Sequence, residues 1–368
     1  MNKVIPNTRG FIGVGVIGAG FARSTQVPAF RACAGARVSA IASGHRENAE
    51  SVAREFDIPF VGADWREVVE RADVDLVCVT TPPVFHLEMT RAALARGKAV
   101  LCEKPLAMTA AETEEMRRLA DEASVLAHVD HELRFVPARQ RARELIAAGE
   151  VGRVRHAKVL FRADSRAATD RAWSWWSDEH AGGGVLGAIG SHAVDALRWL
   201  TGAEVSEVFC RLATHVAERP DGETGVTRRV TSDDEANLLL RFGASDVTEE
   251  SATAAVSLSM VESGEPAHRV EIFGARGALK IEGLKLWRAE VGTGVWEEVE
   301  TDDAPLAEGM RDGEWSRGFT VFSQHIIDAM REGRNVVAGA ATFDDGHRTQ
   351  LVLDAARRAN ESGRSIAL

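Results

Sequence analysis

The six residues GVIGAG at positions 15–20 constrain the fold more than any other part of this 368-residue chain. They end an apolar run and precede a helical pattern, as in the first βα unit of a dinucleotide-binding sheet. Gly18 and Gly20 open the G-x-G-x-x-G fingerprint, but Arg23 stands at the third glycine position. Ala22 takes that place if the turn is one residue shorter, since alanine also lets a helix pack closely on a sheet. Arg23 would then point outward toward a phosphate, so the stretch predicts a nucleotide site rather than a simple glycine turn.

Short apolar runs alternate with helical patterns along the first third of the chain. The runs are Ile12–Ile17, Val38–Ala42, Leu76–Thr80, Ala99–Cys102 and Val125–Val129. The amphipathic stretches between them include Glu47–Phe56, Phe85–Arg96 and Ala110–Ala123. This order predicts an α/β domain of Rossmann type, with a parallel sheet covered by helices on both faces.

The pattern changes at about Arg134. After a helix expected at Ala138–Ala148, the strand-like segments are Arg153–Arg162, Ala236–Phe242, Ala254–Met260, His268–Phe273 and Ala278–Ile281. Runs of consecutive strands predict an α+β domain with a large, mostly antiparallel open sheet. We therefore expect a Rossmann domain over residues 1–132 and an α+β domain over residues 133–368. A polar excursion is expected at 215–234, and the last helix, 344–361, is expected to pack back near the first domain.

Composition excludes several classes of function. The hydrophobic content of 45% and charged content of 27% suit a soluble enzyme, and a net charge of −11 argues against binding nucleic acid or anionic membranes. The chain has no tyrosine, so an acid or base must be Lys, His, Asp, Glu or Cys. Its four cysteines form no C-x-x-C pair and read as buried reduced thiols, which favours the cytoplasm. We expect no signal sequence, no membrane span and no metal site.

The end of the second apolar run bears on the choice of cofactor. An NAD site usually places Asp or Glu there, to accept hydrogen bonds from the adenosine 2′-hydroxyl. This chain has Ser43 at that position, with Arg46 close behind. A carboxylate would repel a 2′-phosphate, whereas Ser and Arg can bind one. The pattern favours NADP over NAD, although Arg46 also fits a solvated residue in a first helical turn.

Two further segments carry candidate catalytic groups. Lys104 follows the fourth apolar run and precedes Pro105, at a strand end where functional groups gather in open α/β sheets. A lysine near a nicotinamide can exchange a proton with a substrate hydroxyl. Downstream, His192 and Asp195 follow a triple-glycine turn and lie three residues apart on one face of a helix. The alternatives are a surface lysine in a turn and a structural histidine.

In order along the chain, these motifs resemble the Gfo/Idh/MocA oxidoreductases, a family that includes glucose–fructose oxidoreductase and inositol dehydrogenase. The resemblance covers nearly the whole chain, and Glu103-Lys104-Pro105 is its most specific motif. The others are the early G-x-G, Thr81-Pro82-Pro83 with His86, His131-x-x-Arg134-Phe135-x-Pro137, the triple glycine with His192, and Phe343-x-Asp345-Gly346.

The resemblance implies a role for each motif. Lys104 meets the substrate hydroxyl or carbonyl through a peptide bond to Pro105 that is commonly cis, and His192, with Asp195, assists proton transfer. Family members often carry Asp four residues before the histidine, but this chain has Ala188. The residues expected at the cofactor are Gly18, Gly20, Phe21, Ala22, Arg23, Ser43, Arg46, Thr81, Pro82, His86, Glu103 and Lys104.

Substrate contacts are expected just before the triple glycine, where indole faces suit the C–H faces of a sugar or cyclic polyol. One tryptophan there also fits a plain core position. Arg162 and Arg166 can bind an anionic substrate or be solvated. The expected substrate residues are His131, Arg162, Trp175, Trp176, Asp178 and His192.

The sequence therefore predicts an NAD(P)-dependent oxidoreductase that moves hydride between nicotinamide and a sugar, polyol or related alcohol or ketone. One alternative is a hydrolase of the same fold that keeps its nicotinamide bound, oxidises a sugar transiently and then adds water. Another is a non-catalytic nucleotide-binding protein, favoured by Ala188 alone. Because the family often associates through the antiparallel sheet of its second domain, we expect a homodimer or homotetramer.

Overall fold

The computed structural model describes residues 10–368, which divide into two compact units. The first unit contains the chain up to Val136 together with Ala304–His347, and the second contains Pro137–Asp303 and Arg348–Leu368. The sequence pattern alone assigns 304–347 to the second domain, whereas the structure counts it with the first. The expected first domain begins at residue 1, so residues 1–9 of it, where a signal sequence would start, lie outside the described residues.

The first unit is built on a six-stranded sheet with the order β16-β5-β4-β3-β1-β2. Strands β1 to β5 run parallel, and β16 is antiparallel to β5. This Rossmann-type sheet confirms the predicted fold class of the first domain. The strands are β1 (Ile12–Ile17), β2 (Ala36–Ala42), β3 (Leu76–Val79), β4 (Ala99–Cys102), β5 (Ala127–Val129) and β16 (Ala341–Thr342).

Helices cover both faces of this sheet, because successive strand residues point into two separate apolar layers. In β3, Leu76 and Cys78 belong to one layer, whereas Val77 and Val79 belong to the other. The helices of the unit are α1 (Gly20–Ser24), α2 (Gln26–Ala32), α3 (Arg46–Phe56), α4 (Trp65–Glu70), α5 (His86–Ala95), α6 (Ala110–Ala123) and α9 (Glu314–Arg331), with short 3₁₀ turns η1 (Pro83–Phe85) and η2 (Glu132–Phe135).

Helix α9 explains why residues 304–347 belong to the first unit. Its Phe319 and Phe322 are fully buried in the same apolar layer as β1 and α2. Phe319 meets Phe30 edge-on with ring centroids 5.8 Å apart, and Phe322 stacks on Phe135 at 4.4 Å. Burying such aromatic surface outweighs proximity in sequence, which links this late helix to the first sheet.

The second unit contains a nine-stranded sheet with the order β15-β14-β13-β12-β6-β11-β10-β7-β17. Only the β6–β11 pair is parallel among its described neighbours, which confirms the predicted, mostly antiparallel sheet. The strands are β6 (Val154–Arg162), β7 (Val205–Ala213), β10 (Glu235–Phe242), β11 (Thr248–Ser259), β12 (Ala267–Gly274), β13 (Gly277–Glu282), β14 (Lys285–Glu290), β15 (Glu297–Val299) and β17 (Ile366–Ala367).

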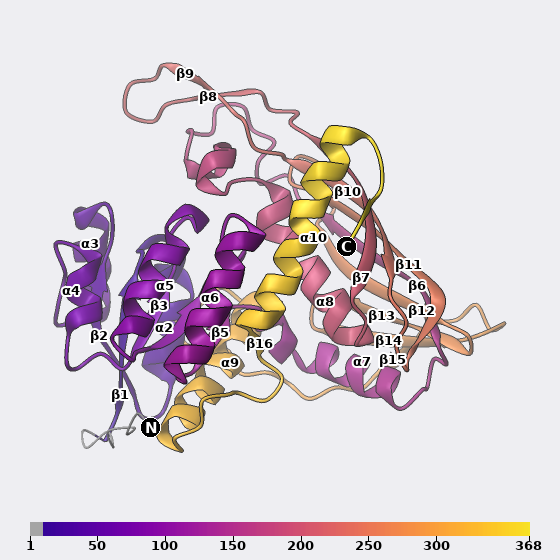
Figure 1. Cartoon of the computed structure of the whole chain (residues 1–368), viewed down its shortest axis with the longest axis horizontal. Coiled ribbons are helices and arrows are strands. Elements are labelled where there is room, and N and C mark those ends of the chain that lie inside the picture. Colours follow the sequence, from indigo (N-terminus) through magenta and orange to yellow (C-terminus); the bar gives the residue numbers. More distant parts are fainter. Residues whose placement is uncertain (1–9) are drawn as a thin grey trace. The chain divides into compact units, whose positions relative to one another are not determined.

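Helices pack on one face of this sheet. The elements are α7 (Pro137–Ala147), α8 (Ser191–Thr201), the short turns η3 (Trp175–Ser177), η4 (Glu179–Ala181) and η5 (Leu186–Gly190), and α10 (Phe343–Ser362), whose first residues count with the first unit. A separate ribbon of β8 (Glu218–Pro220) and β9 (Thr227–Arg229) makes the polar excursion seen at the top of Figure 1.

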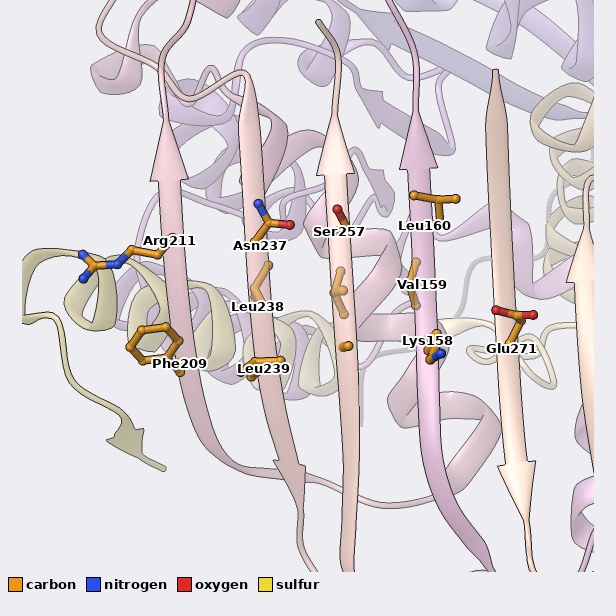
Figure 2. Close-up of a pocket in the computed structure, with 12 residues that line it drawn as sticks. Lys158, Val159, Leu160, Phe209, Arg211, Asn237, Leu238, Leu239, Ser257 and Glu271 are labelled. Carbon is orange, nitrogen blue, oxygen red and sulfur yellow. The ribbon is translucent and has the colours of Figure 1, made fainter. Parts of the chain in front are cut away.

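The other face of the large sheet carries exposed side chains from neighbouring strands. Figure 2 shows Phe209 of β7 and Leu239 of β10 on adjacent strands, followed across the sheet by Ser257 of β11, Lys158 of β6 and Glu271 of β12. Leu239 is 58% exposed, while its neighbour Leu238 on the opposite face is 2% exposed. No helix within residues 10–368 is long and apolar enough to cross a membrane.

Candidate active site

The predicted site residues of the first unit lie at the carboxyl ends of its parallel strands. β2 and β3 lie on either side of β1, so the strand order reverses at β1. In open α/β sheets, ligands bind at such a reversal, outside the carboxyl ends of the strands. The G-x-G turn follows β1, and the Thr81 and Lys104 segments follow β3 and β4.

Gly18 sits where no other residue fits. Its φ is +110°, and a Cβ atom there would lie 2.5 Å from the Thr80 carbonyl oxygen. The Thr80 hydroxyl donates hydrogen bonds to the Ile17 carbonyl (2.9 Å) and the Gly18 carbonyl (3.0 Å). A Cβ at Gly20, by contrast, would meet nothing within 4 Å. The turn is therefore fixed against the end of β3 and leaves open space over Gly20.

Helix α1 places the residues that complete the fingerprint. Ala22 is fully buried against the sheet, as close packing at the third glycine position requires. The Arg23 side chain is 54% exposed and pairs with Glu55 at 2.7 Å, and Phe21 is 39% exposed. Arg23 is thus at the surface with a carboxylate partner.

No carboxylate follows β2 at the position that commonly meets the adenosine ribose. Ser43 is half-buried there, and its hydroxyl accepts a hydrogen bond from the His45 backbone N–H (3.4 Å). Arg46 begins α3, and its Nε donates to Glu50 at 2.8 Å one turn along the helix. An exposed pair of this kind contributes only about 0.3–0.5 kcal/mol, so Arg46 can turn to another anion.

His86 joins the loop after β3 to the loop after β4. Its ring is fully buried, with Nε2 2.8 Å from the Thr81 carbonyl oxygen. Nδ1 lies 3.1 Å from the Pro105 carbonyl oxygen and 3.3 Å from that of Leu106. Burial lowers the pKa of His86, and the positive charge of Lys104 adds to that effect. His86 therefore lies between the Lys104 loop and the Thr81 loop, and its neutral ring, which has one N–H, donates to one of them at a time.

Lys104 follows directly on β4 and remains partly accessible. Its peptide bond to Pro105 is cis, as the resemblance implies. The residue before it, Glu103, is 8% exposed, and the residue after it is buried. Buried Glu103 and Pro105 thus fix the backbone on both sides of Lys104, whose side chain stays partly accessible at the end of the strand.

A buried pair of carboxyl groups lies behind Lys104. The Gln26 side-chain amide donates to Glu103 Oε1 at 3.0 Å and to Asp130 Oδ2 at 3.1 Å, and Asp130 also hydrogen-bonds Glu103 directly. Burial raises the pKa of both carboxyls, and the charge of Glu103 raises that of Asp130 further. A hydrogen bond between two carboxyl groups requires a proton, and the larger upward shift of the Asp130 pKa places that proton on Asp130, which donates to Glu103.

Glu132 extends this carboxyl cluster of Glu103, Asp130 and Glu132. It is 3% exposed, and burial, followed by the charge of Glu103, raises the pKa of Glu132 to about 8. The charge of Lys104 opposes the shift for Glu103 and Glu132 alike. No group of acidic, histidine or cysteine side chains within residues 10–368 has the geometry of a metal site. Because burial raises the pKa of all three carboxyls, the cluster carries less negative charge than three ionised carboxylates would.

The sequence reasoning missed Gln26, Asp130 and Glu132. Asp130 follows β5 directly, so the rule that singled out Lys104 at a strand end would also have found it. Glu132 lies inside the His131 motif. Gln26 has no such signal, because a glutamine in an amphipathic helix normally faces solvent, whereas this one is fully buried.

His131 and two residues of the family motifs lie in the same unit. His131 is 2% exposed and follows β5. Arg134, 5% exposed, pairs with Asp345 at 3.3 Å, and Asp345 also accepts from the Thr342 backbone N–H at 2.9 Å. The pairing joins the Arg134 motif to the Asp345 motif, so both have a structural purpose.

In the second unit, the triple-glycine turn leads into the helix of His192. A Cβ at Gly183 would lie 2.4 Å from the Trp176 carbonyl oxygen, and one at Gly184, whose φ is +112°, would lie 2.5 Å from Asp233 Oδ1. Asp233 Oδ2 accepts from the Leu186 N–H at 2.7 Å, where η5 begins. The turn thus requires glycine and is anchored by a buried carboxylate.

The remaining predicted residues also lie in the second unit. His192 and Asp195 are each 2% exposed on α8, and the rings of Trp175 and Trp176 lie 5.3 Å apart. Asp178 Oδ1 accepts from the His180 N–H at 3.0 Å, so this carboxylate already caps a turn. The Nε of Arg162 donates to the Glu265 carbonyl at 2.9 Å. The ligand roles of these residues remain predictions.

Two domain models of one oxidoreductase family match this chain. Residues 12–131 match the model of an oxidoreductase family with an NAD-binding Rossmann fold, and residues 139–280 match the GFO/IDH/MocA C-terminal domain. An uncharacterized oxidoreductase of Synechocystis is 36% identical over 72% of this chain and 70% of its own length.

Solved structures resemble the whole chain. An oxidoreductase domain protein from Kribbella flavida is 30% identical, with a TM-score of 0.85 over 97% of this chain and 99% of its own. A levoglucosan dehydrogenase in complex with NADH and levoglucosan is 26% identical, with a TM-score of 0.84 over 97% of this chain and 99% of its own.

The raised pKa of Glu132 predicts how stability depends on pH. Folded Glu132 keeps its proton up to about pH 8, whereas the unfolded chain releases it near its ordinary value. The unfolded state then binds fewer protons, so Glu132 lowers the free energy of unfolding by up to about 1.4 kcal/mol per unit of rising pH between pH 5 and 8. Chemical denaturation of Glu132→Gln should show a correspondingly shallower decline than the wild type. The exposed Glu70→Gln serves as control, and equal slopes for all three proteins would contradict the assignment.

Proposed function

Because the chain belongs to the Gfo/Idh/MocA family of oxidoreductases, we propose that it is a nicotinamide-dependent dehydrogenase or reductase. Its substrate is a sugar, a cyclic polyol or a related alcohol or ketone. The observation that carries this proposal is the amine of Lys104, presented at the end of β4 of a Rossmann sheet and backed by buried carboxyls. The likeness to levoglucosan dehydrogenase with NADH and levoglucosan supports a sugar as the substrate.

The residues at the strand ends fit a dinucleotide. The open space over Gly20 and the tight contact of Gly18 with Thr80 match what a pyrophosphate turn needs. Gly18, Gly20, Phe21, Ala22 and Arg23 would hold the pyrophosphate. Thr81, Pro82 and Glu103 would line the nucleotide cleft, whereas the fully buried His86, also predicted there, would support their loops. When bound, the nicotinamide supplies the group that accepts or gives hydride.

Lys104 performs the proton chemistry in this proposal. Its amine takes the proton of the substrate hydroxyl during oxidation and returns it to the carbonyl during reduction. His192 is the second proton-transfer group, and Asp195, one helical turn on, orients it. With Ala188 at the position of the usual aspartate, Lys104 and His192 carry the acid–base work alone. His86 and the carboxyl cluster hold the lysine in place.

Replacing Lys104 tests this assignment. Lys104→Met keeps the length of the side chain and removes the amine, so kcat should fall by about 10²–10⁴-fold on a panel of sugars and polyols. Cofactor binding, followed by nicotinamide fluorescence, should persist. The control is the exposed Lys285→Met, which should keep wild-type turnover. Unchanged activity of Lys104→Met would contradict the catalytic role. Turnover of a glycoside without added cofactor, with nicotinamide released on denaturation, would favour the hydrolase instead.

We include in the proposal a preference for NADP(H), with NAD(H) also accepted. The supporting feature is the absence of a carboxylate at Ser43, together with an Arg46 held only by an exposed pair. A 2′-phosphate can replace Glu50 as the partner of Arg46.

Arg46→Ala should therefore raise the dissociation constant for NADPH about tenfold, equivalent to about 1.4 kcal/mol, and leave that for NADH unchanged. Fluorescence titration of the purified protein with each cofactor measures both constants. Arg54→Ala, an exposed arginine farther along α3, is the matched control. An equal loss of affinity for NADPH and NADH, or no loss of affinity for either, would show that Arg46 does not bind the 2′-phosphate.

We also propose that the chain forms a homodimer or homotetramer through the open face of its large sheet. The face combines the exposed Leu239 with Phe209 and Leu160, and it carries charges of both signs in Lys158 and Glu271 (Figure 2). A patch with apolar centre and mixed charge suits association with a second copy of itself.

Leu239→Glu should shift the protein toward the monomer, because it places a carboxylate at the centre of this face. Sedimentation velocity measures the change, and Val336→Glu, at an exposed position in the first unit, is the control. An assembly that survives Leu239→Glu would place the interface elsewhere.

A further inference from the structure

We propose that the second unit binds an anionic group, a carboxylate or a phosphate, at the guanidinium of Arg166. The inference rests on the proposed function and narrows it, since the substrate becomes an acidic sugar or polyol derivative rather than a neutral one. The chemistry that recognises such a group is a guanidinium with free donors in a partly desolvated place.

Three arginines gather around the loop that follows β6. Arg219 is 3% exposed and donates to the backbone carbonyls of Ala168 (2.7 Å) and Arg166 (2.5 Å). Arg171 donates to the Ser165 carbonyl at 3.0 Å. Within residues 10–368, none of the three makes a salt bridge. Arg219 and Arg171 therefore use backbone carbonyls to frame the loop, and their positive charge is not neutralised by an ion pair.

Arg166 is the member of this group that is open to a ligand. Its guanidinium lies over the indole of Trp176, 4.4 Å from the ring centroid, and is half-buried. No side chain in the described part of the chain accepts a hydrogen bond from it. Burial, and then the charges of Arg171 and Arg219, lowers the pKa of Arg166 to about 10. An anion would relieve this repulsion and restore the hydrogen bonds lost on burial.

Two other buried arginines pair with carboxylates. Arg198, with a side chain 4% exposed, donates to both carboxylate oxygens of Glu204 at 2.7 and 2.9 Å. Arg134 pairs with Asp345. Among residues 10–368, buried Arg219 and half-buried Arg166 have no such carboxylate, which points to a partner from outside the chain.

Two aspartates near the cluster are committed to backbone groups. Asp234 accepts from the N–H groups of His215 and Val216 at 2.9–3.0 Å. Asp233 accepts from the Leu186 N–H. The hollow that these residues share with Arg166 has a volume of about 20 Å³, enough for a water and too small for a carboxylate or phosphate. The anion would therefore bind on the accessible side of Arg166.

Trp176 connects this place to the predicted substrate residues. Its carbonyl accepts from the Ser232 hydroxyl at 2.7 Å and abuts Gly183 in the turn that leads to the His192 helix. Its ring lies beside Trp175. A sugar ring packed on the indoles can therefore extend an acidic substituent to Arg166. A neutral sugar can contact the indoles but has no anionic group for the guanidinium.

Binding measurements on the full chain test the proposal without requiring turnover. Isothermal titration with D-glucuronate, D-glucose 6-phosphate and D-glucose should show at least one acid binding tenfold or more tightly than glucose. The acid that binds better identifies carboxylate or phosphate as the group. Arg166→Gln should abolish the difference, and Arg166→Lys should retain part of it. The matched control Arg155→Gln, at an exposed arginine of β6, should retain all of it.

Equal affinity for the acids and glucose in the wild type would overturn the proposal, as would an unchanged acid preference in Arg166→Gln. If Arg166→Gln fails to fold, the comparison of wild type with Arg166→Lys decides, and identical acid preference would count against the site. A protein that prefers acids but oxidises or reduces none of a panel of acidic and neutral sugars and polyols would contradict the proposed dehydrogenase and leave this site standing.

Discussion

The contact between Gly18 and Thr80 is the constraint on which the candidate site depends. It locks the turn after β1 to the end of β3, and two further links extend the arrangement across the sheet. His86 joins the loop after β3 to the loop after β4. Gln26, on the helix after β1, joins Glu103 after β4 to Asp130 after β5. Adjacent strand ends are thus connected by buried polar groups that hydrogen-bond one another, which preorganises the surface around Lys104.

The carboxyl cluster shows that this preorganisation requires the burial of acidic side chains, which is unfavourable when they are ionised. Burying several ionised carboxylates would be prohibitive, so protons are retained instead and the pKa of Glu132 rises to about 8. The cluster therefore carries less negative charge near neutral pH than its residue types suggest. Protonated Asp130 serves as a hydrogen-bond donor, a function that an asparagine could also supply. Glu132, with its pKa of about 8, makes the charge around Lys104 respond to pH.

Much of the fold follows from local pattern, whereas the site depends on contacts that pattern does not contain. The runs at Ile12–Ile17 and Ala99–Cys102 and the helix at Ala110–Ala123 match the structure residue for residue, because buried strands and an amphipathic helix have strong periodic signals. The assignment of α9 to the first unit depends on Phe319 and Phe322 packing against residues about 200–300 positions earlier. Gln26 and Arg219 look like solvated residues in sequence, since nothing nearby reveals their burial.

The two units differ in how the charge of their buried ionisable side chains is compensated. In the first, burial favours the protonated form of the carboxyls, and the Gln26 side chain donates hydrogen bonds to two of them. In the second, an arginine has no proton to lose near neutral pH, so Arg166 keeps its charge beside two others. That charge can be balanced from within, as Glu204 does for Arg198, or from solution. At Arg166, in a loop beside the predicted substrate residues, we infer that the balancing anion comes from solution. An anion that binds the folded loop and not the unfolded chain also stabilises the folded loop by mass action. Binding of an acidic substrate and ordering of the loop are therefore coupled.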